Sequence, residues 1–190
     1  MPLVENDLKH LTAAQGYVEL GMFLNAIAEL EEIDPEVRHV PEVLEVRVQI
    51  YRALKKWELM QTVAKTLAIH DPDEPQWTVS WAYATRRADS IELARIILVN
   101  AIERMPNVAI FHYNLACYIC QLGDLEKTKE SLHQAFKLDP GMRVIALDDE
   151  DLEPLWDAIE GFQFSGSHAS RFQKIASYRR ARNSMTAAFA

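Results

Sequence analysis

The most reactive side chains in this chain are two cysteines, Cys117 and Cys120, with His112 and His133 close by in sequence. A pair of cysteines two residues apart could bind zinc or exchange disulfides. A structural zinc site needs four convergent ligands, however, and cysteine also packs well as a small buried residue. We therefore interpret both cysteines as packing or groove-lining residues and predict no metal and no cofactor.

A run of four acids, Asp148 to Asp151, could suggest a calcium loop, but the spacing and the glycine of such loops are missing. The run is better placed at the start of a helix, where the helix dipole favours negative charge. The sequence also has no nucleophile elbow, phosphate loop or HExxH pair. It therefore predicts a protein that is not an enzyme and has no catalytic residues.

The clearest structural unit is the stretch from Phe111 to Pro140. Apolar residues recur there at helical spacing on both sides of a turn at Leu122-Gly123-Asp124, which predicts two amphipathic helices. Proline disfavours helical angles in the residue before it, so Asp139-Pro140 ends the unit. With six glycines, eight prolines and few β-branched runs, the whole chain is predicted to be all-α.

This hairpin recurs with a period of 34 residues. The Xaa-Pro pairs ending at Pro72, Pro106 and Pro140 keep that step. Pro41 and Pro75, also 34 apart, are suited to a first helical position. The turns and the apolar residues that follow them keep the same register: Gly21, Lys55, Asp89 and Gly123, then Phe23, Trp57, Ile91 and Leu125. Such a period predicts stacked supersecondary units.

These columns resemble the tetratricopeptide-repeat family, whose unit is a 34-residue helix-turn-helix. The resemblance covers repeats at 7–40, 41–74, 75–108 and 109–142, and is best in the last. It is weaker at 41–74, where Arg47 occupies an expected core position, and at 7–40, where Pro35 shortens the second helix. It implies a right-handed superhelical stack of about four repeats, a solenoid. We expect a domain at 1–162 with a capping helix at about 148–162.

In this family the first helix of each repeat lines a concave groove. The resemblance implies a peptide-binding groove here, with Val18, Val79 and Cys117 beside the polar and aromatic positions Gln15, Gln49, Arg52, Tyr83, Arg86, Arg87, Tyr113 and Gln121. Tyrosine offers a rigid contact, glutamine can bond a peptide backbone and arginine can grip a carboxylate. An acidic peptide segment would suit this mixture. The carboxylate clamp with which some members hold chaperone C-termini is absent, because its positions hold Leu11, Gln15, Glu45, Val46 and Gln76.

The net charge of −8 is unevenly distributed. Residues 161–190 carry five basic side chains and no acid, which leaves 15 basic and 28 acidic side chains in the remainder. An acidic body does not suit nucleic acid. The sequence shows no signal peptide and no apolar run of the ~18 residues that a membrane helix needs. We expect a cytoplasmic protein with a basic tail at 163–190, for which disorder, docking on the acidic body and contact with a partner stay open.

The function predicted from these features is a non-catalytic scaffold or adaptor that binds a peptide segment of a partner protein on its concave face. Two alternatives stay open. Small chaperones of type III secretion have about three such repeats in an acidic chain of similar size, although four repeats and a basic tail depart from that pattern. A self-assembling structural component, a homo-oligomer that packs through its end repeats or its tail, is the other.

Overall fold

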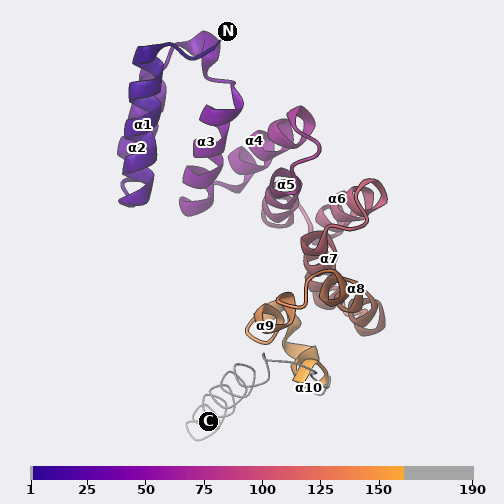
Figure 1. The fold of residues 1–190 in the computed structure, drawn as a ribbon. Coiled ribbons are helices and arrows are strands. Elements are labelled where there is room, and N and C mark those ends of the chain that lie inside the picture. Colours follow the sequence, from indigo (N-terminus) through magenta and orange to yellow (C-terminus); the bar gives the residue numbers. More distant parts are fainter. Residues whose placement is uncertain (1, 161–190) are drawn as a thin grey trace, which may run out of the picture. The chain divides into compact units, whose positions relative to one another are not determined.

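The computed structural model describes residues 2–160, and these contain helices and no strand (Figure 1). Successive α-helices pack in pairs, α1 with α2, α3 with α4, α5 with α6 and α7 with α8. The all-α helix-turn-helix prediction is therefore confirmed. The predicted basic tail at 163–190 lies outside the described residues. The helix bounds are α1 (Glu5–Glu19), α2 (Phe23–Glu32), η1 (Pro35–Val37), α3 (Pro41–Ala53), α4 (Trp57–His70), α5 (Pro75–Ala88), α6 (Ile91–Arg104), α7 (Ala109–Gln121), α8 (Leu125–Leu138), α9 (Met142–Ala146), η2 (Glu150–Leu155) and α10 (Trp156–Glu160).

The chain forms two compact units, Met1–Pro106 and Asn107–Ala190. The N-terminal unit holds the first three hairpins, α1 to α6. The described part of the C-terminal unit holds the fourth hairpin and the short helices α9, η2 and α10. The single repeat domain expected over 1–162 stays a prediction.

The 34-residue period sets where the helices begin. Helices α3, α5 and α7 start at Pro41, Pro75 and Ala109. Both prolines take the first helical position, where a missing N–H leaves no hydrogen bond unmade. Helix α2 has 10 residues against 14 in α4, because Pro35 begins the separate 3-10 helix η1.

In three of the four hairpins the turn contains one residue with left-handed backbone angles. Gly21, Lys55 and Gly123 have φ values of 71°, 55° and 88°, which is the left-handed region. Glycine enters this region at no steric cost, whereas a residue with a Cβ is strained there. Asp89 has φ −119° instead. There Ser90 caps α6, its hydroxyl oxygen accepting an N–H of the first turn at 3.2 Å.

Small residues lie where the helices cross. The recurring positions Ala14, Val48, Ala82 and Ala116 are all buried. Small side chains let two helix backbones approach closely, which is how each hairpin closes over its own apolar stripe. Larger buried residues such as Leu30 and Ile50 fill the remaining space in the N-terminal unit.

Arg47 stands in an otherwise apolar column and is accommodated by an ion pair. Its Nη2 lies 2.8 Å from Glu31 Oε1, and its Nη1 lies 3.3 Å from the Tyr51 hydroxyl oxygen. Glu31 also pairs with Arg38 at 2.7 Å. The hydrogen bond from Arg47 lowers the pKa of the Glu31 carboxyl, and burial opposes this only in part. A bridge between α2 and α3 thus replaces an apolar contact between adjacent hairpins.

The segment after α8 differs from the single capping helix expected at 148–162. Asp149 caps the 3-10 helix η2 by accepting the Asp151 N–H at 3.0 Å, and α10 begins at Trp156. Pro154 lies inside η2 and has no N–H to donate, which disfavours one continuous α-helix through this segment. The apolar residues of this segment are nevertheless buried, at Leu152, Leu155, Trp156 and Ile159.

Candidate functional site

In the N-terminal unit, two arginines and two aromatic residues form one cluster. The Arg87 guanidinium carbon lies 3.5 Å from the Tyr83 ring centroid and 5.3 Å from that of Trp57. The Arg52 guanidinium carbon lies 5.1 Å from the Tyr83 centroid. The two rings meet edge to face, with centroids 5.8 Å apart and planes at 74°. Cations over aromatic faces are attracted by the ring quadrupole, and such ring pairs are favourable.

The helix-turn-helix geometry brings these four residues together. Arg52 lies in the last turn of α3, and Trp57 begins α4 directly after the turn at Lys55. Tyr83 and Arg87 are one helical turn apart on α5, so their side chains are neighbours. The Arg87 Nη1 donates to the Tyr83 carbonyl at 3.3 Å, which fixes the guanidinium over the ring.

The charges of this cluster face solvent. Arg52 and Arg87 are exposed, and no carboxylate of residues 2–160 forms an ion pair with either. A guanidinium stacked on a ring keeps N–H donors in its plane available for a carboxylate, which it can bind with two parallel hydrogen bonds. The exposed Lys55 and Lys56 add positive charge nearby. The arrangement is suited to holding an anion and supplies no nucleophile.

The structure brings together three of the groove residues predicted from sequence, Arg52, Tyr83 and Arg87. Gln15 and Gln49 are exposed on α1 and α3, which pack against each other. Arg86 is partly buried on α5. Trp57 was missed as a site residue, because its place in the apolar column after the turn indicated only core packing. An aromatic residue in that column directly after Lys55-Lys56 was the available signal.

The two groove positions predicted in the C-terminal unit, Tyr113 and Gln121, both hydrogen-bond to a later segment of the chain; Tyr113 is buried, whereas Gln121 stays exposed. The Tyr113 hydroxyl donates to Asp149 Oδ2 at 2.8 Å, and Gln121 Nε2 donates to the Asp151 carbonyl at 2.9 Å. Tyr113 is only 5% exposed, and its burial, followed by the nearby Cys117 and Asp149, raises the pKa of its hydroxyl. The segment at 149–151 therefore lies against α7 at these positions, and peptide binding by Tyr113 and Gln121 stays a prediction.

The cysteines lie in the same covered region. Cys117 Sγ and the carboxylates of Asp149 and Asp151 all lie within 4.8 Å of one another, the one such grouping of three in the described chain. Asp149 Oδ2 already accepts hydrogen bonds from Tyr113 and, at 3.5 Å, from the Cys117 thiol. Burial, together with Asp151 and Asp149, raises the pKa of the Cys120 thiol. A raised pKa leaves less of the Cys120 thiol in its reactive thiolate form.

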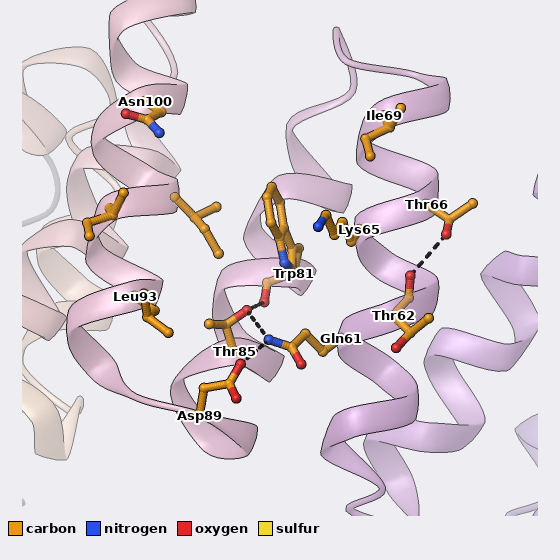
Figure 2. Close-up of a pocket in the computed structure, with 12 residues that line it drawn as sticks. Gln61, Thr62, Lys65, Thr66, Ile69, Trp81, Thr85, Asp89, Leu93 and Asn100 are labelled. Atoms are coloured by element: carbon orange, nitrogen blue, oxygen red, sulfur yellow. Dashed lines mark hydrogen bonds between the residues drawn. The ribbon is translucent and has the colours of Figure 1, made fainter.

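A second surface of the N-terminal unit, which the sequence did not indicate, is a groove between α4 and α6. Trp81 and Thr85 of α5 form its floor (Figure 2). Its volume is about 650 Å³. Gln61 Nε2 donates to Thr85 Oγ1 at 3.1 Å and also to Asp89. The groove is also lined by Lys65 and Asn100 and by the exposed apolar side chains of Ile69, Leu93 and Ile96.

Four helical hairpins with a 34-residue period and small residues at the helix crossings define a protein with the tetratricopeptide-repeat fold. The helices of residues 2–160 are all too short or too polar to span a membrane.

Solved structures agree with this fold. MamA 41-end from Desulfovibrio magneticus RS-1 matches with a TM-score of 0.63 at 17% identity, over 95% of this chain and 98% of that one. A thermophilic TPR protein from Thermus thermophilus matches with a TM-score of 0.59 at 21% identity, over 80% of this chain and 82% of that one. MamA MSR-1 C2 matches with a TM-score of 0.60 at 20% identity, over 70% of this chain and 76% of that one. No family of proteins and no curated protein matches by sequence.

Proposed function

We propose that this protein is a non-catalytic scaffold that holds a peptide segment of another protein on the α3 and α5 face of its N-terminal unit. The observation that carries the proposal is the pair of exposed guanidiniums, Arg52 and Arg87, stacked on Tyr83 without a carboxylate partner in the described chain. An anionic group of a partner would complete their hydrogen bonding.

The surroundings of the pair suit a peptide. Gln49 precedes Arg52 by three residues on α3, so both side chains lie on one side of that helix. A glutamine amide can both donate to and accept from a peptide backbone. Tyr83 and Trp57 add rigid surface that loses little conformational entropy on binding, which is why aromatic residues are common at binding hot spots.

Fold comparisons support the scaffold function at a coarser level. Repeat folds of this kind commonly present extended surfaces to protein partners. The fold hosts many unrelated functions, so the choice of partner must come from the chemistry of the site. That chemistry favours a protein segment with carboxylates.

Site-specific photo-crosslinking tests the proposal. The photoreactive residue p-benzoylphenylalanine replaces Gln49 in the full chain, and mass spectrometry identifies the captured segment after irradiation in cells. Matched control positions are the exposed Thr62, in the α4–α6 groove, and the exposed Glu126, on α8. We expect a captured protein segment at position 49 that is lost when Arg52 and Arg87 are both changed to alanine. Equal capture at all three positions, or capture indifferent to the arginines, contradicts the proposal.

A further inference from the structure

The tip of the first hairpin, the turn from Leu20 to Leu24, exposes an unusual amount of apolar surface. Leu20 and Leu24 are 72% and 75% exposed, and Met22 between them is exposed as well. Gly21 supplies the left-handed backbone angles of this turn. Single exposed leucines are common on protein surfaces, whereas a contiguous apolar patch marks a surface that another molecule contacts.

The repeat register shows which residues the apolar tip replaces. The position of Met22 holds Ser90 and Asp124 in the third and fourth hairpins, and each of these side chains caps its helix by accepting a backbone N–H. Met22 makes no cap of this kind. In the other three hairpins the position of Leu24 holds a glutamate: Glu58, Glu92 and Glu126. An N-cap and an acid in the first turn both stabilise a helix, so the first hairpin lacks two local stabilising features and has an apolar tip in their place.

The groove between α4 and α6 is a second apolar surface of the same unit (Figure 2). Trp81 lies at its floor, and the exposed side chains of Ile69, Leu93 and Ile96 lie along its sides. The residues of the tip do not line the groove of their own molecule. The two surfaces can therefore meet only when two copies of the chain associate.

The register also shows why this groove is open. Trp81 and Lys65 correspond to Arg47 and Glu31 one period earlier, where the two side chains form an ion pair at 2.8 Å. In the groove the Lys65 ammonium instead lies 5.6 Å from the Trp81 ring centroid. No carboxylate of residues 2–160 forms an ion pair with Lys65. The groove thus combines an apolar floor with a cation that is available to a carboxylate.

The charges of the tip and the groove are opposite. Glu19 directly precedes Leu20 and is exposed, and no cation of the described residues forms an ion pair with it. Lys65 is the cation among the groove residues. The acid that lines the groove, Asp89, already accepts a hydrogen bond from Gln61. A tip that enters the groove can therefore bring its carboxylate to Lys65.

We propose that the tip of one molecule, Leu20 to Leu24, inserts into the α4–α6 groove of a second copy, with Glu19 paired to Lys65. The contact joins two different surfaces, so each copy keeps a free tip or a free groove, and further copies add head to tail until a ring closes or a filament forms. The inference goes beyond the proposed function and does not depend on it, because the α3 and α5 face takes no part in the contact.

Sedimentation velocity of the full chain at a series of concentrations tests the contact. The unmodified protein should associate as its concentration rises. Met22→Asp combined with Leu24→Glu, the tip variant, introduces the residue types of positions 124 and 126 and should be monomeric. These changes add a helix cap, so urea unfolding should show a protein at least as stable as the unmodified one. The groove variant, Ile96→Glu, should also be monomeric.

Matched controls separate the contact from a general loss of apolar surface. Leu8→Glu on α1 and Leu59→Glu on α4 change leucines that are 48% and 47% exposed, against 47% for Ile96, and both lie outside the tip and the groove. Both controls should associate as the unmodified protein does. If they impair association as much as the tip and groove variants, the contact is not specific and the inference is wrong.

Mixing the two monomeric variants gives the sharpest result. The tip variant keeps an intact groove and the groove variant keeps an intact tip, so an equimolar mixture should form a one-to-one dimer that grows no further. A mixture that stays monomeric, while the unmodified protein associates, shows that other surfaces join the copies. An unmodified protein that is monomeric at every concentration also overturns the inference, and it leaves the scaffold function, tested by capture at position 49, untouched.

The ion pair and the place of the tip are tested separately. Glu19→Lys and Lys65→Glu should each weaken association about fivefold, and the combined variant should recover most of that loss. The photoreactive residue at Thr62, which lines the groove, should capture residues 19–24 of another copy. No recovery in the combined variant, or capture of a different segment at position 62, contradicts the proposed contact.

Discussion

The two units present the same helical face in two different states. In the C-terminal unit Tyr113 and Gln121 are bonded to the chain's own acidic segment. In the N-terminal unit the register counterpart of Gln121 is Arg87, which is exposed and stacked on Tyr83. The backbone period is identical, so the difference lies in side chains and in which segment follows each hairpin. A repeat fold fixes the positions, and the residues there decide whether a position binds a segment of its own chain or stays open to another.

The strongest way to break the comparison is to release the internal segment. Leu152→Ala removes a fully buried anchor, and such changes cost about 3 kcal/mol of stability. We expect η2 to detach and the amides of α7 to lose protection in hydrogen exchange measured by mass spectrometry. Leu122→Ala, at a leucine that is 40% exposed, is the matched control. Unchanged protection of α7 in the Leu152 variant would show that η2 does not hold this face closed.

A more selective change removes the carboxylate and keeps the apolar anchors. Asp149→Ala leaves the buried Tyr113 hydroxyl without its acceptor, which should cost about 2 kcal/mol in denaturant unfolding of the C-terminal unit. Adding Tyr113→Phe removes the stranded donor as well and should restore about half of the loss. If the double variant is as unstable as the single one, the Tyr113–Asp149 bond is not what ties the segment to α7.

Much of the fold could be predicted from the sequence, because the 34-residue columns report burial and turn geometry directly. Pro41 and Pro75 marked helix starts, and Gly21 and Gly123 marked turns. The segment after α9, with η2 and α10, could not be predicted so well. Pro154 was a local signal against one capping helix, but local propensity does not reveal that Asp149 reaches an earlier helix.

The candidate site divides in the same way. Arg52, Tyr83 and Arg87 were predicted, because their helical positions follow from the repeat register. The covering of Tyr113 was not, since it depends on a contact between residues 36 apart in sequence. The α4–α6 groove was missed because no motif in the sequence marks it; in the structure Trp81 forms part of its floor and stays partly accessible.

The N-terminal unit contains an ion pair between adjacent hairpins, the Glu31–Arg47 bridge. Glu31→Gln should lower the stability of that unit by less than about 1 kcal/mol at pH 7, because the Glu31 side chain is 47% exposed and solvent screens the pair. The pKa of Glu31 is lowered on folding, so its contribution is present above the ordinary value of 4.5 and is lost as pH falls through the lowered pKa. Urea unfolding between pH 7 and pH 3 should therefore show the free energies of unfolding of the unmodified protein and the Glu31→Gln variant becoming equal at acid pH. Glu103→Gln, at an exposed carboxylate on α6, is the control. If the Glu31→Gln variant is still less stable than the unmodified protein at acid pH, the ion pair with Arg47 is not the cause of its lower stability.

The smallest effect sharpens the comparison at the turns. The fourth hairpin turns at Gly123, whereas the second turns at Lys55, whose backbone is strained at φ 55° because lysine has a Cβ. Lys55→Gly should raise the stability of the N-terminal unit by about 0.5 kcal/mol, the relief of strain being partly offset by the greater freedom of glycine in the unfolded chain. Asp89→Gly, where φ is −119°, should give no gain in the same urea titration. Lys55 lies two residues before Trp57, so the stabilised variant should also capture less of the partner segment by crosslinking at position 49. A gain in stability without that loss would mean that Lys55 does not contribute to the binding surface around Arg52 and Arg87. The strained residue at this turn would then need another explanation.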